Sequence, residues 1–153
     1  MRVAAMALAV LMLSAASCEA QTPPPQSPAM FLAQNALADG VRSLPSGVQY
    51  KVVKAGPGTS RHPTPEDYVT VNYEGSLLNG QIFDSSFQKG QPATFQLKTL
   101  IPGWIEAVQQ MKEGDEWLVW VPPQLAYGDK QHGPIPGNSV LLFRLQLVSI
   151  LGG

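Results

Sequence analysis

The sequence has little charge, one cysteine and two histidines, and each shortage excludes a class of function. Its formal net charge of −1 provides no basic surface with which to displace the counterions of a nucleic acid. The single cysteine, Cys18, excludes an internal disulfide. Neither His62 nor His132 stands at metal-ligand spacing from a cysteine or carboxylate. We therefore expect no nucleic acid, no metal and no cofactor.

The 153 residues suit one compact domain with appendages, because two domains of ordinary size need a longer chain. The hydrophobic content of 44% is ordinary for a globular protein. Fourteen glycines and fourteen prolines indicate turns and short strands in place of long helices. No Gly-rich phosphate loop, Ser–His arrangement or catalytic carboxylate pair stands out.

The N-terminus carries the pattern of an export signal. Arg2 precedes an apolar run over residues 3–16, which is too short for a comfortable membrane span and is followed by small residues. We expect residues 1–20 to be a signal peptide. Since no second run of membrane-spanning length follows, the remainder should be soluble or tethered at most.

Cys18 allows two interpretations of this signal. Its place after Ala15, Ala16 and Ser17 resembles a bacterial lipoprotein signal that ends before Cys18, although such signals usually carry Leu where Ala15 stands. Lipidation of Cys18 would tether the domain to a membrane, and Glu19 is not the aspartate associated with inner-membrane retention. Alternatively, cleavage nearby, for example after Ala20, would remove Cys18.

The rest of the chain divides into three parts. Residues 21–28 form a proline-rich linker, with a Pro-Pro-Pro run typical of an extended spacer. Residues 29–43 form a short helical arm, whose helix over 29–38 ends at Asp39-Gly40. Residues 44–153 form the globular domain.

Alternating apolar and polar residues predict several strands in that domain. They lie at 47–54, 67–78, 94–97, 116–121 and 140–150, and Asn79-Gly80 predicts a hairpin turn onto a strand that contains Phe83. Within 104–112 an apolar stripe of Trp104, Val108 and Met111 predicts the one helix. The fold class is therefore α+β, an antiparallel sheet with one face folded over a short helix.

Five segments in sequence order resemble the FKBP family of prolyl isomerases, in particular its bacterial exported branch typified by the macrophage infectivity potentiator. They are LPSGVQYKV, VNYEGSLLNGQIFDSS, IPGWIEAVQQMKEGDEW, VPPQLAYG and LLFRLQLVSI, within residues 44–151. The resemblance implies a twisted antiparallel β-sheet wrapped around one short α-helix, with a short N-terminal helix. It also implies a peptidyl-prolyl cis–trans isomerase that acts on proline-containing polypeptides in the bacterial periplasm, or from an outer-membrane anchor.

By the same resemblance, an apolar pocket lies between sheet and helix. Its implied lining is Tyr73, Phe83, Asp84, Phe95, Leu100, Ile101, Trp104, Tyr127 and Phe143. Such a pocket suffices for catalysis, because the barrier to X-Pro rotation comes from amide resonance that is lost in the less dipolar twisted state. An apolar site therefore favours the twisted amide without a nucleophile or metal.

Individual roles follow from the resemblance, and each has a structural alternative. Trp104 would form the floor under the proline ring, whereas its spacing alone is also that of a core anchor. The Tyr127 hydroxyl and the Ile101 N–H would bind substrate carbonyls, although an aromatic before Gly also caps surface loops. Asp84 would orient Tyr73 and set the local field, whereas an Asp before Ser also caps turns.

Departures from the family pattern affect ligand preference. The basic position falls at Lys89, a flanking aromatic position is Ala93, and the loop over 131–136 follows the bacterial form, with His132 expected near the rim. Binding of a macrolide of the FK506 or rapamycin type is therefore left open. Two other functions remain: an FKBP-fold chaperone or ligand-binding module with little activity, and an envelope-anchored structural protein. We expect a monomer.

Overall fold

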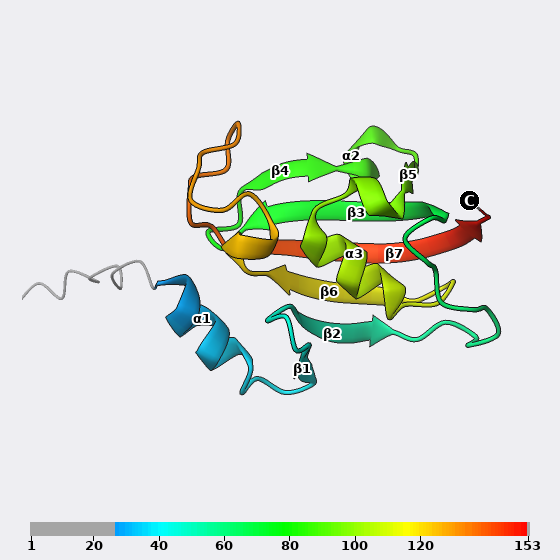
Figure 1. The fold of residues 1–153 in the computed structure, drawn as a ribbon, viewed down its shortest axis with the longest axis horizontal. Coiled ribbons are helices and arrows are strands. Elements are labelled where there is room, and N and C mark those ends of the chain that lie inside the picture. Colours follow the sequence, from blue (N-terminus) through cyan, green and yellow to red (C-terminus); the bar gives the residue numbers. More distant parts are fainter. Residues whose placement is uncertain (1–26, 153) are drawn as a thin grey trace, which may run out of the picture.

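A computed structural model describes residues 27–152, and the predicted signal peptide, the linker before Ser27 and Cys18 lie outside this part. The described chain forms one curved antiparallel sheet with helix α3 across its inner face (Figure 1). The strands run in the order β1-β2-β6-β7-β3-β4, and β5 also pairs with β3. Within residues 27–152, no helix is long and apolar enough to cross a membrane.

The elements follow the predicted pattern with additions. The strands are β1 (Val41–Ser43), β2 (Gln49–Lys54), β3 (Tyr68–Leu77), β4 (Ile82–Ser85), β5 (Ala93–Gln96), β6 (Glu116–Val121) and β7 (Leu141–Leu151). The helices are α1 (Pro28–Asn35), α2 (Ser86–Lys89) and α3 (Pro102–Gln109), with 3₁₀ turns η1 (Leu97–Thr99) and η2 (Pro123–Leu125). The α+β prediction of a twisted sheet around one short helix, preceded by a short N-terminal helix, is confirmed.

The long central strands have the predicted two-faced pattern. Alternate residues of β3 from Val69 to Leu77 are buried, and so are alternate residues of β7 from Leu141 to Leu147. These inner-face side chains pack against Trp104, Ala107 and Val108 of α3. The hairpin from β3 to β4 turns at Gly80, whose φ of 90° is a conformation that suits glycine. The core therefore lies between α3 and the inner face of the sheet.

The helix α3 ends earlier than predicted. The periodicity extends to Met111, which is fully buried, but the regular helix stops at Gln109. The Asp115 carboxylate accepts hydrogen bonds from the backbone N–H of Lys112 (3.0 Å) and of Gly56 (2.6 Å). Because this carboxylate takes the Lys112 N–H, the chain turns away from the helix axis before β6.

The N-terminal arm is shorter in helix and richer in strand than predicted. The helix α1 begins at Pro28, which we assigned to the linker, and ends at Asn35 instead of residue 38, while β1 falls within the expected arm and pairs with β2. Gln49 on β2 is buried; it donates to the carbonyl of Leu32 (2.7 Å) and accepts from Asn35 (2.8 Å). Tertiary pairing, which local propensity does not encode, thus holds the arm against the domain.

Candidate functional site

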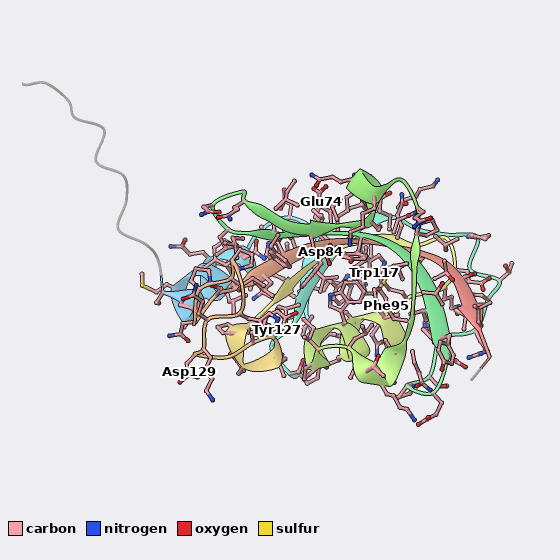
Figure 2. All side chains as sticks on the ribbon, turned by 90° about the horizontal axis from the view of Figure 1, so that it is seen from above. Glu74, Asp84, Phe95, Trp117, Tyr127 and Asp129 are labelled. Atoms are coloured by element: carbon pink, nitrogen blue, oxygen red, sulfur yellow. The ribbon has the colours of Figure 1, made fainter. Side chains whose placement is uncertain are left out.

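The nine predicted lining residues surround one cavity of about 220 Å³ between the sheet and α3. They are Tyr73, Phe83, Asp84, Phe95, Leu100, Ile101, Trp104, Tyr127 and Phe143. Figure 2 shows Asp84 on the sheet side of this space and Tyr127 on the loop side. The structure therefore brings the whole predicted set together, while the role of each residue stays a prediction.

The floor of the cavity is an aromatic cluster centred on Trp104. Its indole meets three rings nearly edge-on, those of Tyr73 (5.4 Å between centroids), Phe143 (5.3 Å) and Phe95 (6.2 Å). Edge-to-face contacts at this spacing are favourable beyond the area they bury. Trp104 is only 4% exposed, so it serves as a core residue and as the cavity floor at once.

A glycine in β3 makes room for two of the aromatic walls. A Cβ atom at Gly75 would lie 2.6 Å from the Phe83 ring and 2.8 Å from the Phe143 ring. The two rings therefore rest on bare backbone, where they meet edge-on at 5.8 Å. Any side chain at position 75 would push these rings into or away from the cavity.

Three polar side chains joined by hydrogen bonds form the rim of the cavity on the side of the sheet. The Tyr73 hydroxyl donates to Asp84 Oδ2 (2.6 Å), and Lys89 Nζ lies 3.0 Å from Asp84 Oδ1. Burial, reinforced by the hydrogen bond to Asp84, raises the pKa of the Tyr73 phenol, which stays protonated as a donor. Burial would raise the pKa of Asp84, but the bonds from Tyr73 and Lys89 outweigh it and lower that pKa. Asp84 is thus a carboxylate with both oxygens bonded.

The opposite rim is carried by the loop that follows η2. Tyr127 is half-buried there, and its ring stacks on the exposed imidazole of His132, with centroids 4.1 Å apart and planes 4° from parallel. The loop closes on itself through an isolated bridge between His132 and Ile135. The expectation that His132 lies near the rim is correct, and its contact is with Tyr127.

Leu100 and Ile101 line the cavity between η1 and α3. Ile101 is the N-cap of α3 with φ −61° and ψ 149°, the extended geometry expected for a residue before proline. Its carbonyl accepts from Trp104 N–H (3.0 Å) and Ile105 N–H (3.2 Å). The first turn of α3 therefore fixes Ile101 at the edge of the aromatic floor.

Sequence reasoning missed two contributors to the site. Lys89 was recognised only as a basic position, and its ion pair with Asp84 depends on α2, a four-residue helix too short to leave a periodic pattern. Ser86 was not singled out, although its buried hydroxyl bonds the backbone of Tyr73. The paired serines after Asp84 were the available signal, because serine at a helix start typically caps it.

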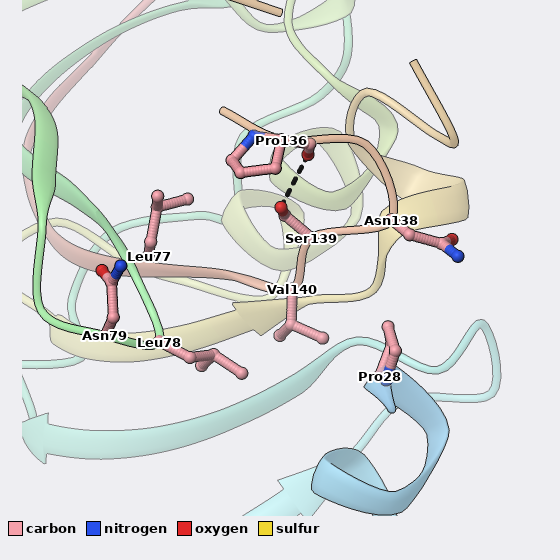
Figure 3. Close-up of a pocket in the computed structure, with 8 residues that line it drawn as sticks. All are labelled: Pro28, Leu77, Leu78, Asn79, Pro136, Asn138, Ser139 and Val140. Carbon is pink, nitrogen blue, oxygen red and sulfur yellow. Dashed lines mark hydrogen bonds between the residues drawn. The ribbon is translucent and has the colours of Figure 1, made fainter. Parts of the chain in front are cut away.

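A second cavity of about 190 Å³ lies where α1 approaches the turn after β3 and the start of β7 (Figure 3). Its lining is Pro28, Leu77, Leu78, Asn79, Pro136, Asn138, Ser139 and Val140. The Ser139 hydroxyl donates to the Pro136 carbonyl (2.6 Å), which uses its one donor proton within the wall. No residue of this lining is charged or aromatic, whereas the first cavity has both a carboxylate and aromatic walls.

The chain is similar to known prolyl isomerases. The profile of the family described as FKBP-type peptidyl-prolyl cis-trans isomerase matches residues 59–148. The chain is 53% identical to the peptidyl-prolyl cis-trans isomerase Mip of Coxiella burnetii, over 78% of this chain and 52% of that protein. It is 48% identical to a probable FKBP-type isomerase, FkpA, of Neisseria meningitidis, over 78% of this chain and 44% of that protein. This chain thus spans about half the length of these curated relatives.

Solved structures agree with the sequence matches. A crystal structure of a peptidyl-prolyl cis-trans isomerase from Pseudomonas syringae superposes with a TM-score of 0.75 at 32% identity, covering 81% of this chain and 90% of that chain. The crystal structure of FkpA from Escherichia coli gives a TM-score of 0.77 at 36% identity, over 82% of this chain and 58% of that chain.

Proposed function

Because the chain belongs to the FKBP-type peptidyl-prolyl cis-trans isomerase family, we propose that it accelerates rotation about X-Pro bonds in polypeptides. The observation that carries the proposal is the single cavity in which all nine expected residues meet. Eight of them present aromatic, aliphatic or phenolic surface, and Asp84 is the one carboxylate.

The cavity suits catalysis by an apolar environment that favours the twisted amide, without any covalent or acid-base step. The planar amide is dipolar, and the twisted transition state loses the resonance that makes it so. Transfer from water into an apolar space of about 220 Å³ therefore costs the planar amide more than the twisted one. The proline ring would pack on the indole of Trp104, which faces the cavity from its floor.

The polar groups would hold the peptide around the rotating bond. Under this proposal the Tyr127 hydroxyl and the Ile101 N–H bind carbonyls on either side of the proline. Asp84 and Tyr73 form the other rim, where the carboxylate supplies a fixed negative field near the twisting amide. No proton transfer is needed, which agrees with a Tyr73 phenol whose pKa is raised and an Asp84 whose pKa is lowered.

The substrates we propose are proline-containing segments of exported proteins. Uncatalysed prolyl isomerisation takes tens of seconds or longer, so folding outside the cytoplasm gains from such a catalyst. A macrolide of the FK506 or rapamycin type is a further proposed ligand for this apolar cavity. Ala93, which is partly buried beside the core, leaves that side of the cavity less enclosed than an aromatic would.

We further propose a periplasmic location with a lipid tether at Cys18. A similar protein of Legionella longbeachae, 47% identical, is named an outer membrane protein, and this name supports the proposal of an envelope location. Expression of wild type and Cys18→Ser in a bacterial host, followed by membrane fractionation and intact mass, tests the tether. A lipid-sized mass in wild type alone supports it, and cleavage after Ala20 in both contradicts it.

A cis-to-trans assay tests the activity directly. The substrate is an X-Pro tetrapeptide with a bulky apolar residue before proline. Acceleration by the wild type, inhibited by a macrolide, supports an isomerase. A folded protein that binds the peptide without acceleration would favour the binding-module alternative, and one that does not bind it would favour the structural protein.

A further inference from the structure

The hydrogen-bond ladder of β3 has a gap beside the cavity. Pairing with β4 reaches Glu74, and pairing with β5 begins at Val71, so Asn72 and Tyr73 fall between the two partner strands. The helix α2, which connects β4 to β5, lies next to this gap. Tyr73 needs partners for its backbone here, since unpaired buried N–H and C=O groups are costly.

One side chain supplies both partners. The Ser86 hydroxyl accepts from the Tyr73 N–H (2.8 Å) and donates to the Tyr73 carbonyl (3.3 Å). Ser86 is 1% exposed, so water does not compete for these bonds. A single hydroxyl thereby replaces the pair of bonds that a neighbouring strand would make.

The residue held in this way bears the phenol of the sheet-side rim. The Tyr73 ring lies edge-on to Trp104, and its hydroxyl donates to Asp84. Ser86 is also the first residue of α2, whose last residue, Lys89, pairs with the other oxygen of Asp84. Both partners of the carboxylate therefore depend on where Ser86 sits.

We propose that Ser86 is a positioning residue of the isomerase site, which aligns Tyr73 and Lys89 on Asp84 by clamping the Tyr73 backbone to α2. The proposal rests on the proposed function and assigns a residue that does not itself line the cavity. A misplacement of the rim by a fraction of an ångström is enough to reduce catalysis, because the effect of an oriented charge depends on geometry.

The neighbouring serine provides a matched control. Ser85 is also buried, and its hydroxyl caps α2 by accepting from the Gln88 N–H (3.2 Å) and contacts Glu74 (3.3 Å). Ser85→Ala thus deletes the same group one residue away without touching Tyr73. Ser86→Cys replaces the hydroxyl with a thiol, so the site stays filled but the hydrogen-bonding group is weaker.

The experiment combines kinetics with NMR of wild type, Ser86→Ala, Ser86→Cys and Ser85→Ala. We expect kcat/KM to fall about tenfold in Ser86→Ala and about threefold in Ser86→Cys, mainly through kcat. The ¹³Cζ signal of Tyr73 should move toward that of an unbonded phenol, and the carboxyl titration of Asp84 should shift to higher pH. In Ser85→Ala the Tyr73 signal should stay in place.

A double-mutant cycle separates positioning from stability. In a Tyr73→Phe background, Ser86→Ala should lower kcat/KM by clearly less than tenfold, since the Tyr73 hydroxyl is gone and only the effect through Lys89 on Asp84 remains. The proposal would be overturned if Ser86→Ala showed the same Tyr73 signal and the same Asp84 titration as the wild type. If the alanine variant does not fold, Ser86→Cys serves for the same comparison. If the wild type were inactive but Ser86→Ala still produced the expected changes in the Tyr73 signal and the Asp84 titration, the isomerase function would be refuted and the clamp would stand.

Discussion

The two rims of the cavity are built in different ways. On the sheet side, Tyr73, Asp84 and Lys89 sit on β3, β4 and α2 and are joined by hydrogen bonds of 2.6 and 3.0 Å. On the loop side, Tyr127 follows η2 and is supported by a stack on His132, an exposed residue. The first rim is tied into the sheet, whereas the second belongs to a surface loop.

The difference separates two tasks of a rotation catalyst. The field at the twisting amide must be fixed before the substrate arrives, because reorganisation during the reaction would reduce its benefit. Binding the flanking peptide tolerates more adjustment, and clients with different sequences require it. We therefore expect changes on the sheet-side rim to lower kcat and changes on the loop-side rim to raise KM.

The largest expected effect comes from the floor that both rims share. Trp104→Ala should remove about 3–5 kcal/mol of unfolding free energy and abolish most of the isomerase activity, because it deletes a buried aromatic that contacts three pocket rings. Denaturant unfolding and the tetrapeptide assay measure the two effects. Trp120→Ala, on the outer face of β6, is the control: it should lose stability but keep its rate per folded molecule. Equal losses of rate in both variants would contradict the assignment.

Asp84→Ala should have the next largest effect. It leaves the Tyr73 hydroxyl and Lys89 without their shared acceptor, so we expect kcat to fall about tenfold with KM little changed. Steady-state kinetics over a range of peptide concentrations resolve the two parameters. A change confined to KM would place Asp84 among the binding groups and remove the contrast between the rims.

Tyr127→Phe should have a smaller effect of the opposite kind. Loss of one neutral hydrogen bond contributes about 1 kcal/mol, which corresponds to a rise in KM of roughly fivefold at unchanged kcat. His132→Ala, which removes the stacking partner and leaves the hydroxyl, should raise KM less than that. If Tyr127→Phe lowered kcat as strongly as Asp84→Ala does, the loop-side rim would share the catalytic task.

The smallest expected effect is that of Lys89→Gln, which should shift the loss of isomerase activity at low pH to a slightly higher pH. The folded-state pKa of Asp84 lies below its ordinary value, so its contribution is present above about pH 4 and is lost as pH falls through the folded pKa. Lys89→Gln removes one group that lowers this pKa, and the loss should therefore begin at a higher pH. Rates measured from pH 3 to 7 in both proteins test this. The shift will be modest because the pair is solvent-exposed.

Much of the fold could be predicted from the sequence, because the central strands alternate strictly. The buried series on β3 and β7 and the Trp104 stripe on α3 each follow one period. The edges could not be predicted in this way. Strand β1 exists through its pairing with β2, and α2 exists through the caps and clamps of Ser85 and Ser86.

The site likewise has a part that could be expected from the sequence and a part that could not. Its nine lining residues were expected from the resemblance to a family, and the structure groups them. The contacts that hold Tyr73, Tyr127 and Asp84 in place come from Ser86, His132 and Lys89. These contacts join residues whose spacing carries no periodic signal, and only the three-dimensional arrangement reveals them.

The most direct test is the cis-to-trans rate of an apolar-X-Pro tetrapeptide, measured with the wild type, Asp84→Ala and Tyr127→Phe side by side. The account predicts clear acceleration by the wild type, a fall in kcat for Asp84→Ala and a rise in KM for Tyr127→Phe. A folded wild type that does not accelerate the reaction, or variants that match it in both parameters, would contradict the account.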